Sequence, residues 1–125
     1  MDVFVQEWIN FGERTQFMAY LFGRYQRKEG PNGVREIALV YSLYKPKQRW
    51  ETGRIVLEKD DLMNCVNGVA ASLNLQCVGM VYTSAPHEDP LTAFDVDFIA
   101  PLQLRFKVRS EFASKFVTVI VKRDA

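Results

Sequence analysis

The stretch LQCVGMVYTSAP, residues 75–86, decides how this chain is organised. Its middle, residues 77–82, is almost wholly apolar, which predicts a buried strand over residues 75–83. The strand ends abruptly in Thr83 and Ser84, and a proline follows shortly after. Catalytic groups of many α/β enzymes lie at the C-terminal end of a central strand. The end of this strand is therefore the first place to look for chemistry.

Upstream of this strand the sequence predicts a helix and a hairpin. The apolar spacing over residues 2–14 is typical of a helix. Residues 16–27 and 34–44 are expected to pair as antiparallel strands around a Pro-Asn-Gly turn within residues 28–33. The middle of the second strand is continuously apolar, so we expect it to be covered on both faces. Residues 45–54 are expected to form a polar loop.

A second helix is predicted immediately before the buried strand. Apolar residues recur at helical spacing from Leu62 to Leu73. Asp60 or Asp61 is expected to cap its N-terminus, and Asn74 to end it.

Downstream of the strand we expect three elements: a loop at 84–92, a helix within 93–108 and a strand at 114–123. Asp95 or Asp97 is expected to cap the helix, with Pro101 in its first turn or at a kink. The order of elements predicts a single α/β or α+β domain over residues 1–125.

Composition indicates a globular domain without a charge-driven partner. The chain has 125 residues, of which 48% are hydrophobic and 25% charged, and its formal net charge is +1. This balance gives no electrostatic support for binding to nucleic acid or to an anionic membrane. No apolar run reaches the ~18 residues of a membrane-spanning helix. The acidic N-terminus lacks the basic region of a signal peptide.

Cysteine and histidine are too few for a structural zinc site. Cys65 and Cys77 are expected to be buried free thiols rather than a disulfide. His87 lies only three residues from Ser84, too close to serve readily as the base of a nucleophilic serine. Thr83 and Ser84 are therefore expected to be turn residues that satisfy their own backbone.

Two groups of charged residues remain ambiguous from the sequence. The adjacent acids 60–61, 88–89 and 95–97 are expected to be helix caps or solvated surface rather than acid–base pairs. The basic residues of segment 45–49 lie beside Trp50, and they form either a solvated loop or a contact for a ubiquitin-like protein.

Three stretches of the chain resemble one known family. They are MAYLFGRY (18–25), LQCVGMVYTS (75–84) and SKFVTVIV (114–121). In order and spacing they resemble the MPN (JAB1/MPN/Mov34) domain family, and within it the nuclear protein localization protein 4 branch. The resemblance covers most of the chain. It implies an MPN-like mixed β-sheet flanked by helices and shortened at its C-terminal end.

The resemblance also shows what the end of the strand lacks. Active MPN proteases hold a zinc ion with two His and one Asp, and a Glu acts as general base on the metal-bound water. Here Gln16 stands at the position of the Glu, and Tyr82 and Ser84 at the positions of the two His. Thr92 and Asp95 stand at the family's Ser and Asp positions. The resemblance therefore implies a catalytically inactive domain with no metal and no cofactor.

What the resemblance implies instead is binding. The implied partners are ubiquitin or polyubiquitin, the valosin-containing (Cdc48-type) AAA ATPase and its ubiquitin-fusion-degradation partner. The implied role is ubiquitin-dependent degradation, including that at the endoplasmic reticulum, with the protein in the cytoplasm and nucleus. The candidate binding residues, most of them lining a vestigial groove, are Gln16, Trp50, Tyr82, Thr83, Ser84, Thr92 and Asp95.

Other interpretations stay open. The chain could be an inactive MPN scaffold subunit of a proteasome-lid, signalosome or translation-initiation assembly, a hydrolase with an unrecognised site, or an unrelated α/β domain. Within these 125 residues we expect no counterpart of the family's N-terminal ubiquitin-like domain or zinc-binding region. It ends soon after SKFVT, so we expect a fragment or a short form, with strand edges left exposed.

Overall fold

The computed structural model describes residues 2–10, 16–51, 54–84, 93–107 and 115–122. Its elements in chain order are α1 (Asp2–Asn10), β1 (Met18–Gly30), β2 (Gly33–Tyr44), β3 (Gln48–Glu51), β4 (Arg54–Leu57), α2 (Met63–Ser72), β5 (Gln76–Thr83), α3 (Ala93–Arg105) and β6 (Val117–Val121). The mixture of helices and a mixed sheet confirms the predicted α+β class. Among the described residues no helix is long and apolar enough to cross a membrane.

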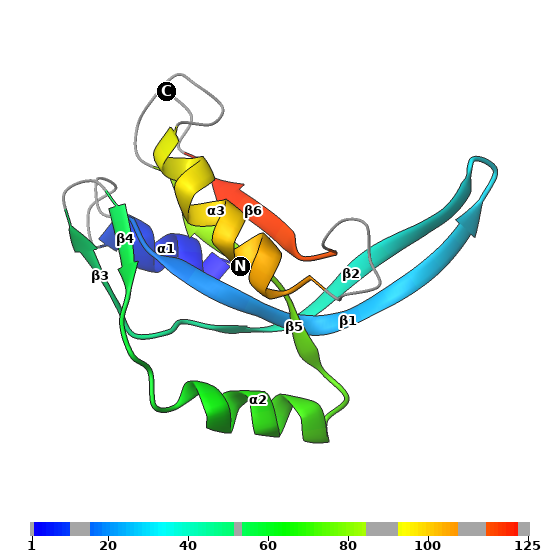
Figure 1. Ribbon diagram of the computed structural model, residues 1–125, viewed down its shortest axis with the longest axis horizontal. Helices are drawn as coiled ribbons and strands as arrows, with labels where there is room; N and C mark the ends of the chain where they lie inside the picture. The colour runs from blue at the N-terminus through cyan, green and yellow to red at the C-terminus, as the bar shows by residue number, and fades with distance from the viewer. Residues whose placement is uncertain (1, 11–15, 52–53, 85–92, 108–114, 123–125) are drawn as a thin grey trace.

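One mixed sheet organises the fold, with strand order β2-β1-β5-β6 (Figure 1). β1 pairs with both β2 and β5 in antiparallel fashion, while β5 and β6 are parallel. A parallel pair needs a crossover, and α3 lies in the segment that connects these two strands. The predicted strand at 75–83 is thus confirmed as an interior strand of the sheet.

Each face of the sheet carries its own apolar cluster. Alternate side chains of β1 divide between the two faces, because successive residues of a strand point in opposite directions. Met18, Tyr20 and Phe22 join a cluster with side chains of α2, α3 and β4. Ala19 and Leu21 join a second cluster that Phe4 of α1 completes. Helices thus cover the centre of the sheet on both sides.

The hairpin of β1 and β2 extends well beyond this covered centre. Its two-residue turn, Pro31–Asn32, is followed by Gly33 at φ 110°, a conformation that L side chains seldom adopt. Figure 1 shows the far part of the hairpin projecting away from all helices. β2 is an edge strand and is largely exposed over residues 33–42. The expectation that this strand is covered on both faces was therefore wrong.

A second hairpin replaces most of the predicted loop at 45–54. β3 and β4 pair with Trp50 opposite Ile55, and Ile55 reaches the core. Gln48 joins this hairpin to β1. Its Oε1 accepts from the Met18 amide at 2.7 Å and its Nε2 donates to the Met18 carbonyl at 2.8 Å. The side-chain amide thus imitates a strand partner, which no local sequence pattern reveals.

Asp60 does not cap α2 but joins neighbouring segments of the chain through hydrogen bonds to its carboxylate. The cap position of α2 is Leu62, without a side-chain hydrogen bond. Asp60 accepts from Tyr44 Oη at 2.6 Å, from the Lys47 amide at 3.1 Å and from the Leu62 amide at 3.0 Å. The predicted stop at Asn74 is confirmed, since this residue adopts φ 58° just beyond the helix.

Stability should fall in acid partly through Asp60. The Tyr44 hydroxyl holds the pKa of Asp60 below its usual 3.8, and the same bond raises the pKa of Tyr44 to about 12. Folding therefore favours the charged carboxylate, whose contribution is complete above pH 3.8 and is lost as pH falls through the lowered pKa. We expect the melting temperature of Asp60→Asn to lie below that of the wild type at neutral pH. The gap should narrow in melts recorded at successively lower pH below 3.8, and a gap that stays constant with pH would contradict this account.

Two smaller expectations need correction, and a third is narrowed. Pro101 lies inside α3 rather than in its first turn, which leaves the other alternative, a kink. Asp95 lies in the first turn and Asp97 beyond it, so neither precedes the helix as a cap. Both cysteines are free, as predicted, but Cys65 is exposed and Cys77 only partly buried.

Candidate functional site

The C-terminal end of β5 lies inside the protein. Tyr82, Thr83 and Ser84 are all at most 3% exposed. The Thr83 amide donates to the Phe17 carbonyl at 3.0 Å, and the Ser84 amide donates to the Val121 carbonyl at 2.9 Å. The strand end is thus fixed between β1 on one side and β6 on the other.

Gln16 occupies the position that the resemblance assigns to a general base. Its Nε2 donates to the Thr83 carbonyl at 3.1 Å, and the residue is buried. Thr83 Oγ1 in turn accepts from the Phe17 amide at 3.0 Å. The two polar side chains therefore tie the entry of β1 to the exit of β5. A carboxamide has no proton-accepting role at neutral pH, so this arrangement is structural.

Tyr82 and Asp95 meet across the sheet and α3. Tyr82 Oη donates to Asp95 Oδ1 at 3.1 Å, and both residues are buried. Burial, helped by the Asp95 carboxylate, raises the pKa of Tyr82 above its usual value of 10. Tyr82 therefore stays a neutral donor at physiological pH. It is not a phenolate that could bind a metal ion.

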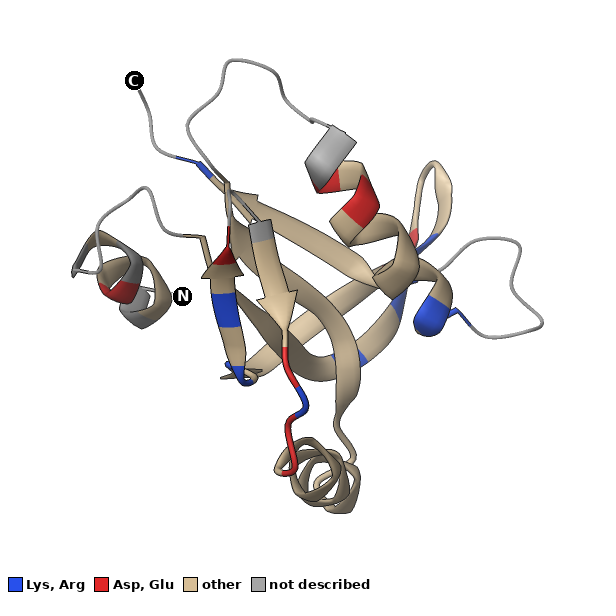
Figure 2. Cartoon of the chain, turned by 60° about the vertical axis from the view of Figure 1, so that its left-hand side comes forward, with Lys and Arg blue, Asp and Glu red and all other residues tan. Residues whose placement is uncertain are grey.

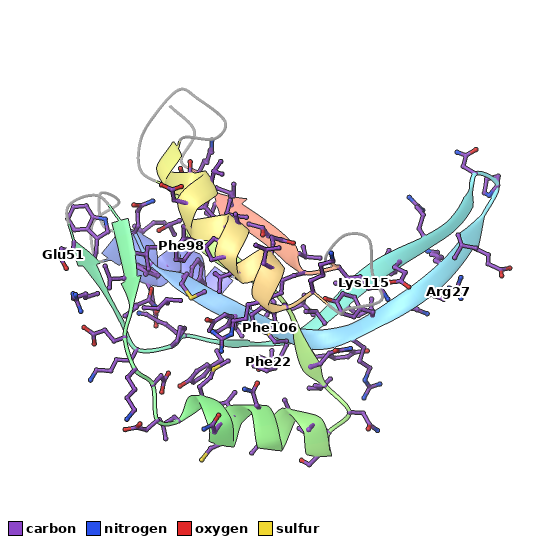
Figure 3. All side chains as sticks on the ribbon, in the orientation of Figure 1. Phe22, Arg27, Glu51, Phe98, Phe106 and Lys115 are labelled. Atoms are coloured by element: carbon purple, nitrogen blue, oxygen red, sulfur yellow. The ribbon has the colours of Figure 1, made fainter. Side chains whose placement is uncertain are left out.

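Phe98 completes this contact, although the sequence analysis did not single it out. Its ring packs edge-on against Tyr82 with the centroids 5.6 Å apart. Phe98 follows Asp95 by three residues, which places both on one face of α3. That spacing was the available sequence signal. Figure 3 labels Phe98 on this helix.

The structure brings together five of the seven candidate residues. Gln16, Tyr82, Thr83, Ser84 and Asp95 form one buried cluster around the end of β5. Trp50 lies apart from them on β3 and is 41% exposed. Thr92 lies outside the described residues, as does His87.

The basic side chains next to Trp50 are held in surface ion pairs. Lys45 pairs with Glu7 at 3.2 Å, and Arg49 pairs with both Glu51 and Glu58 at 3.0 Å. Such exposed pairs contribute little stability, about 0–1 kcal/mol each. They do keep this surface electrically balanced, with Trp50 as its large apolar group.

The cluster at the end of β5 does not fit a catalytic zinc ion. Such a site needs three protein ligands and one open position. Of the cluster, only Asp95 is a common zinc ligand, and it accepts the Tyr82 hydrogen bond. Within the described part of the chain no three His, Cys, Asp or Glu side chains gather as a metal site would require.

Comparison with known proteins identifies the family. The model of the NPL4 family matches residues 17–92, more than half of the chain. The chain is 27% identical to the nuclear protein localization protein 4 homolog of Drosophila melanogaster over 96% of its length. It is 30% identical to the human homolog over 95%, and 29% identical to the Lodderomyces elongisporus protein over 97%. The chain belongs to the NPL4 family, which confirms that part of the sequence-based expectation.

The chain corresponds to only part of each of these relatives. The chain spans only 22% of the Drosophila and human proteins and 23% of the Lodderomyces protein.

Proposed function

We propose that this chain is a non-catalytic MPN-type domain that binds ubiquitin or polyubiquitin. It would act within a cofactor of the valosin-containing (Cdc48-type) AAA ATPase, alongside the ubiquitin-fusion-degradation partner. Membership of the NPL4 family supports this proposal over a scaffold subunit of a proteasome-lid, signalosome or translation-initiation assembly. We place the protein in the cytoplasm and nucleus, including the surface of the endoplasmic reticulum.

The Tyr82–Asp95 hydrogen bond is the observation that most strongly supports a non-catalytic domain. In an active MPN protease these two positions supply ligands to zinc, and the metal keeps one position open for water. Here the donor and acceptor bind each other at 3.1 Å inside the protein. The side-chain amide of Gln16 likewise donates its hydrogen bond to the Thr83 carbonyl. The site is closed by its own side chains.

We propose that ubiquitin contacts the β3–β4 hairpin through Trp50. Of the seven candidate residues, the five at the end of β5 are buried, while Trp50 offers an exposed aromatic surface. Tryptophan is enriched at the energetic centres of interfaces because it buries a large area with few rotatable bonds. The surrounding ion pairs would form the polar rim that such a centre requires. The buried cluster would then support the hairpin without touching the partner.

An NMR titration tests this proposal. Isotope-labelled ubiquitin, single and chained, is titrated with the unlabelled chain. We expect shifts on one face of ubiquitin, weakened at least about fivefold in Trp50→Ala, as expected for an interface centre. Trp50→Ala should remain folded, as a cooperative thermal melt would show, since the side chain is already 41% exposed. Tyr82→Phe is the matched control and should bind as the wild type does.

Two results would overturn the proposal. Unshifted ubiquitin signals at about 500 µM of the chain would exclude a ubiquitin receptor of useful affinity. Cleavage of a ubiquitin chain, with stoichiometric zinc by elemental analysis, would exclude a non-catalytic domain.

A further inference from the structure

From the exposed side of the β1–β2 hairpin we infer a second docking surface, for an extended partner segment that is apolar at one end and acidic at the other. The surface consists of the groove between α2 and β2 and the basic face of the projecting hairpin. It is independent of the proposed ubiquitin contact, which lies on β3.

The groove is apolar and open. Its volume is about 390 Å³, within the usual range of ligand pockets. Phe22 of β1 lies at its floor, between the sheet and α2 (Figure 3). Val69 on α2 and Leu73 just beyond its end line it and remain 61% and 58% exposed. α2 carries no charged residue, as its uniform tan colour in Figure 2 shows. Exposed apolar surface of this kind marks interaction sites.

The edge strand beside the groove lacks the usual protection. Natural edge strands avoid unwanted pairing through charges, prolines or short length. Residues 37–44, IALVYSLY, contain no charge and no proline, and β2 has no second neighbour in the described part of the sheet. Val40 and Tyr41 are 45% and 60% exposed. The run has the composition of a covered strand, and an added strand would cover it.

Basic side chains continue this surface along the hairpin. Phe22, Arg24 and Lys28 alternate along β1 and so share one face, and Arg35 lies directly opposite Lys28. Arg24 adjoins the groove, since it donates to the carbonyls of Leu73 and Asn74 at 3.2 and 3.1 Å. The face therefore runs from an apolar groove to a row of cations.

Lys28 and Arg35 form an unfavourable pair within the hairpin. Like charges directly opposite each other on paired strands are destabilising. No ion pair in the described residues offsets either charge, whereas Glu36, an acid on the other face, is held by Lys115 at 2.8 Å. Folding alone gives no reason for this pair. An acidic partner does, since it would neutralise both cations.

The same charges argue against a second copy as the occupant. A symmetric dimer brings the same patch of both copies together. Antiparallel pairing through the uncharged run 37–44 would bring no acid of the second copy to Arg35 at the end of β2, since the chain continues beyond this run with Lys45, Pro46 and Lys47. Charge complementarity instead selects a segment with acidic residues beyond its apolar part.

A designed peptide tests the surface. The probe is a fluorescein-labelled peptide with an alternating valine–threonine half and an aspartate–glutamate half, made in both chain directions. Its binding to the full chain is followed by fluorescence anisotropy. One direction should bind, and its affinity should fall as salt rises from about 50 to 500 mM. The same peptide with lysine in place of the acids should bind at least about tenfold more weakly.

Neighbouring residues of β1 provide a matched control. Lys28→Glu should weaken binding about three- to tenfold, while Arg27→Glu, the same charge change on the opposite face, should change it less than about twofold. Arg27 is labelled on the projecting hairpin in Figure 3. Lys28→Glu should also raise the melting temperature by about 1–3 °C, because it converts a like-charge pair into an ion pair. Val69→Ser tests the groove and should weaken binding without unfolding the chain.

Several results would overturn the inference. They are equal binding of the lysine peptide, equal effects of Lys28→Glu and Arg27→Glu, or no binding at about 1 mM. A concentration-dependent dimer that Lys28→Glu strengthens would show that a second copy occupies the surface instead.

Discussion

Tyr82→Ala should lower the free energy of unfolding by about 3–5 kcal/mol, the usual cost of removing a large aromatic side chain from a core. Tyr82 is 1% exposed, and its ring packs edge-on against Phe98. The substitution leaves a cavity and also removes the hydrogen bond to the buried Asp95. Chemical denaturation at neutral pH measures the loss.

Two further variants separate the causes of that loss. Tyr82→Phe keeps the ring and removes only the hydroxyl, so it should cost about 1–3 kcal/mol through the Asp95 oxygen left without this donor. Tyr41→Ala removes the same side chain at a site 60% exposed, and should cost less than about 1 kcal/mol. Equal losses for Tyr82→Ala and Tyr41→Ala would contradict the buried placement of the strand end.

Gly23→Ala is the second substitution with a large expected effect, a loss of about 3 kcal/mol, the upper end for overpacking. Gly23 lies where the β1–β2 register shifts, and an added Cβ would overlap the Leu39 carbonyl oxygen of the partner strand. Backbone cannot rotate away as a side chain can, so the strands would have to separate. The melting temperature and amide exchange of β2 report the change.

Gly68→Ala is the matched control for that substitution. Gly68 lies within α2, and an added Cβ there meets no atom within 4 Å beyond its chain neighbours and the adjacent backbone of the helix itself. Alanine favours a helix over glycine, so this variant should gain about 0.5–1 kcal/mol. A destabilised Gly68→Ala together with an unaffected Gly23→Ala would contradict the packing described for α2 and for the β1–β2 pair.

The sequence predicted the interior strand and the helix α2 because their apolar patterns and turn residues act locally. The β3–β4 hairpin could not be predicted, because it is held to β1 by hydrogen bonds between the Gln48 side chain and the Met18 backbone. These bonds join residues far apart in the sequence. The sequence predicted cover for β2 because an apolar run indicates the chemistry of a strand but not its neighbours. The exposed edge follows only from the sheet order.

The candidate site divides in the same way. The resemblance grouped Gln16, Tyr82, Ser84 and Asp95, and the structure brings them together at the end of β5. Their burial could not be predicted, since it depends on how β6 and α3 pack over that end. The sequence-based expectation that these residues contact a partner is untested, and the proposal above places that contact at Trp50, the exposed candidate.

The most direct test of a ubiquitin-binding, non-catalytic domain observes this chain rather than ubiquitin. The isotope-labelled chain gives two indole N–H signals, one each from Trp8 and Trp50. On titration with polyubiquitin the account predicts that the Trp50 signal shifts, while the backbone signals of Thr83 and Ser84 stay in place. An unmoved Trp50 signal, or shifts centred on Thr83 and Ser84, would contradict it.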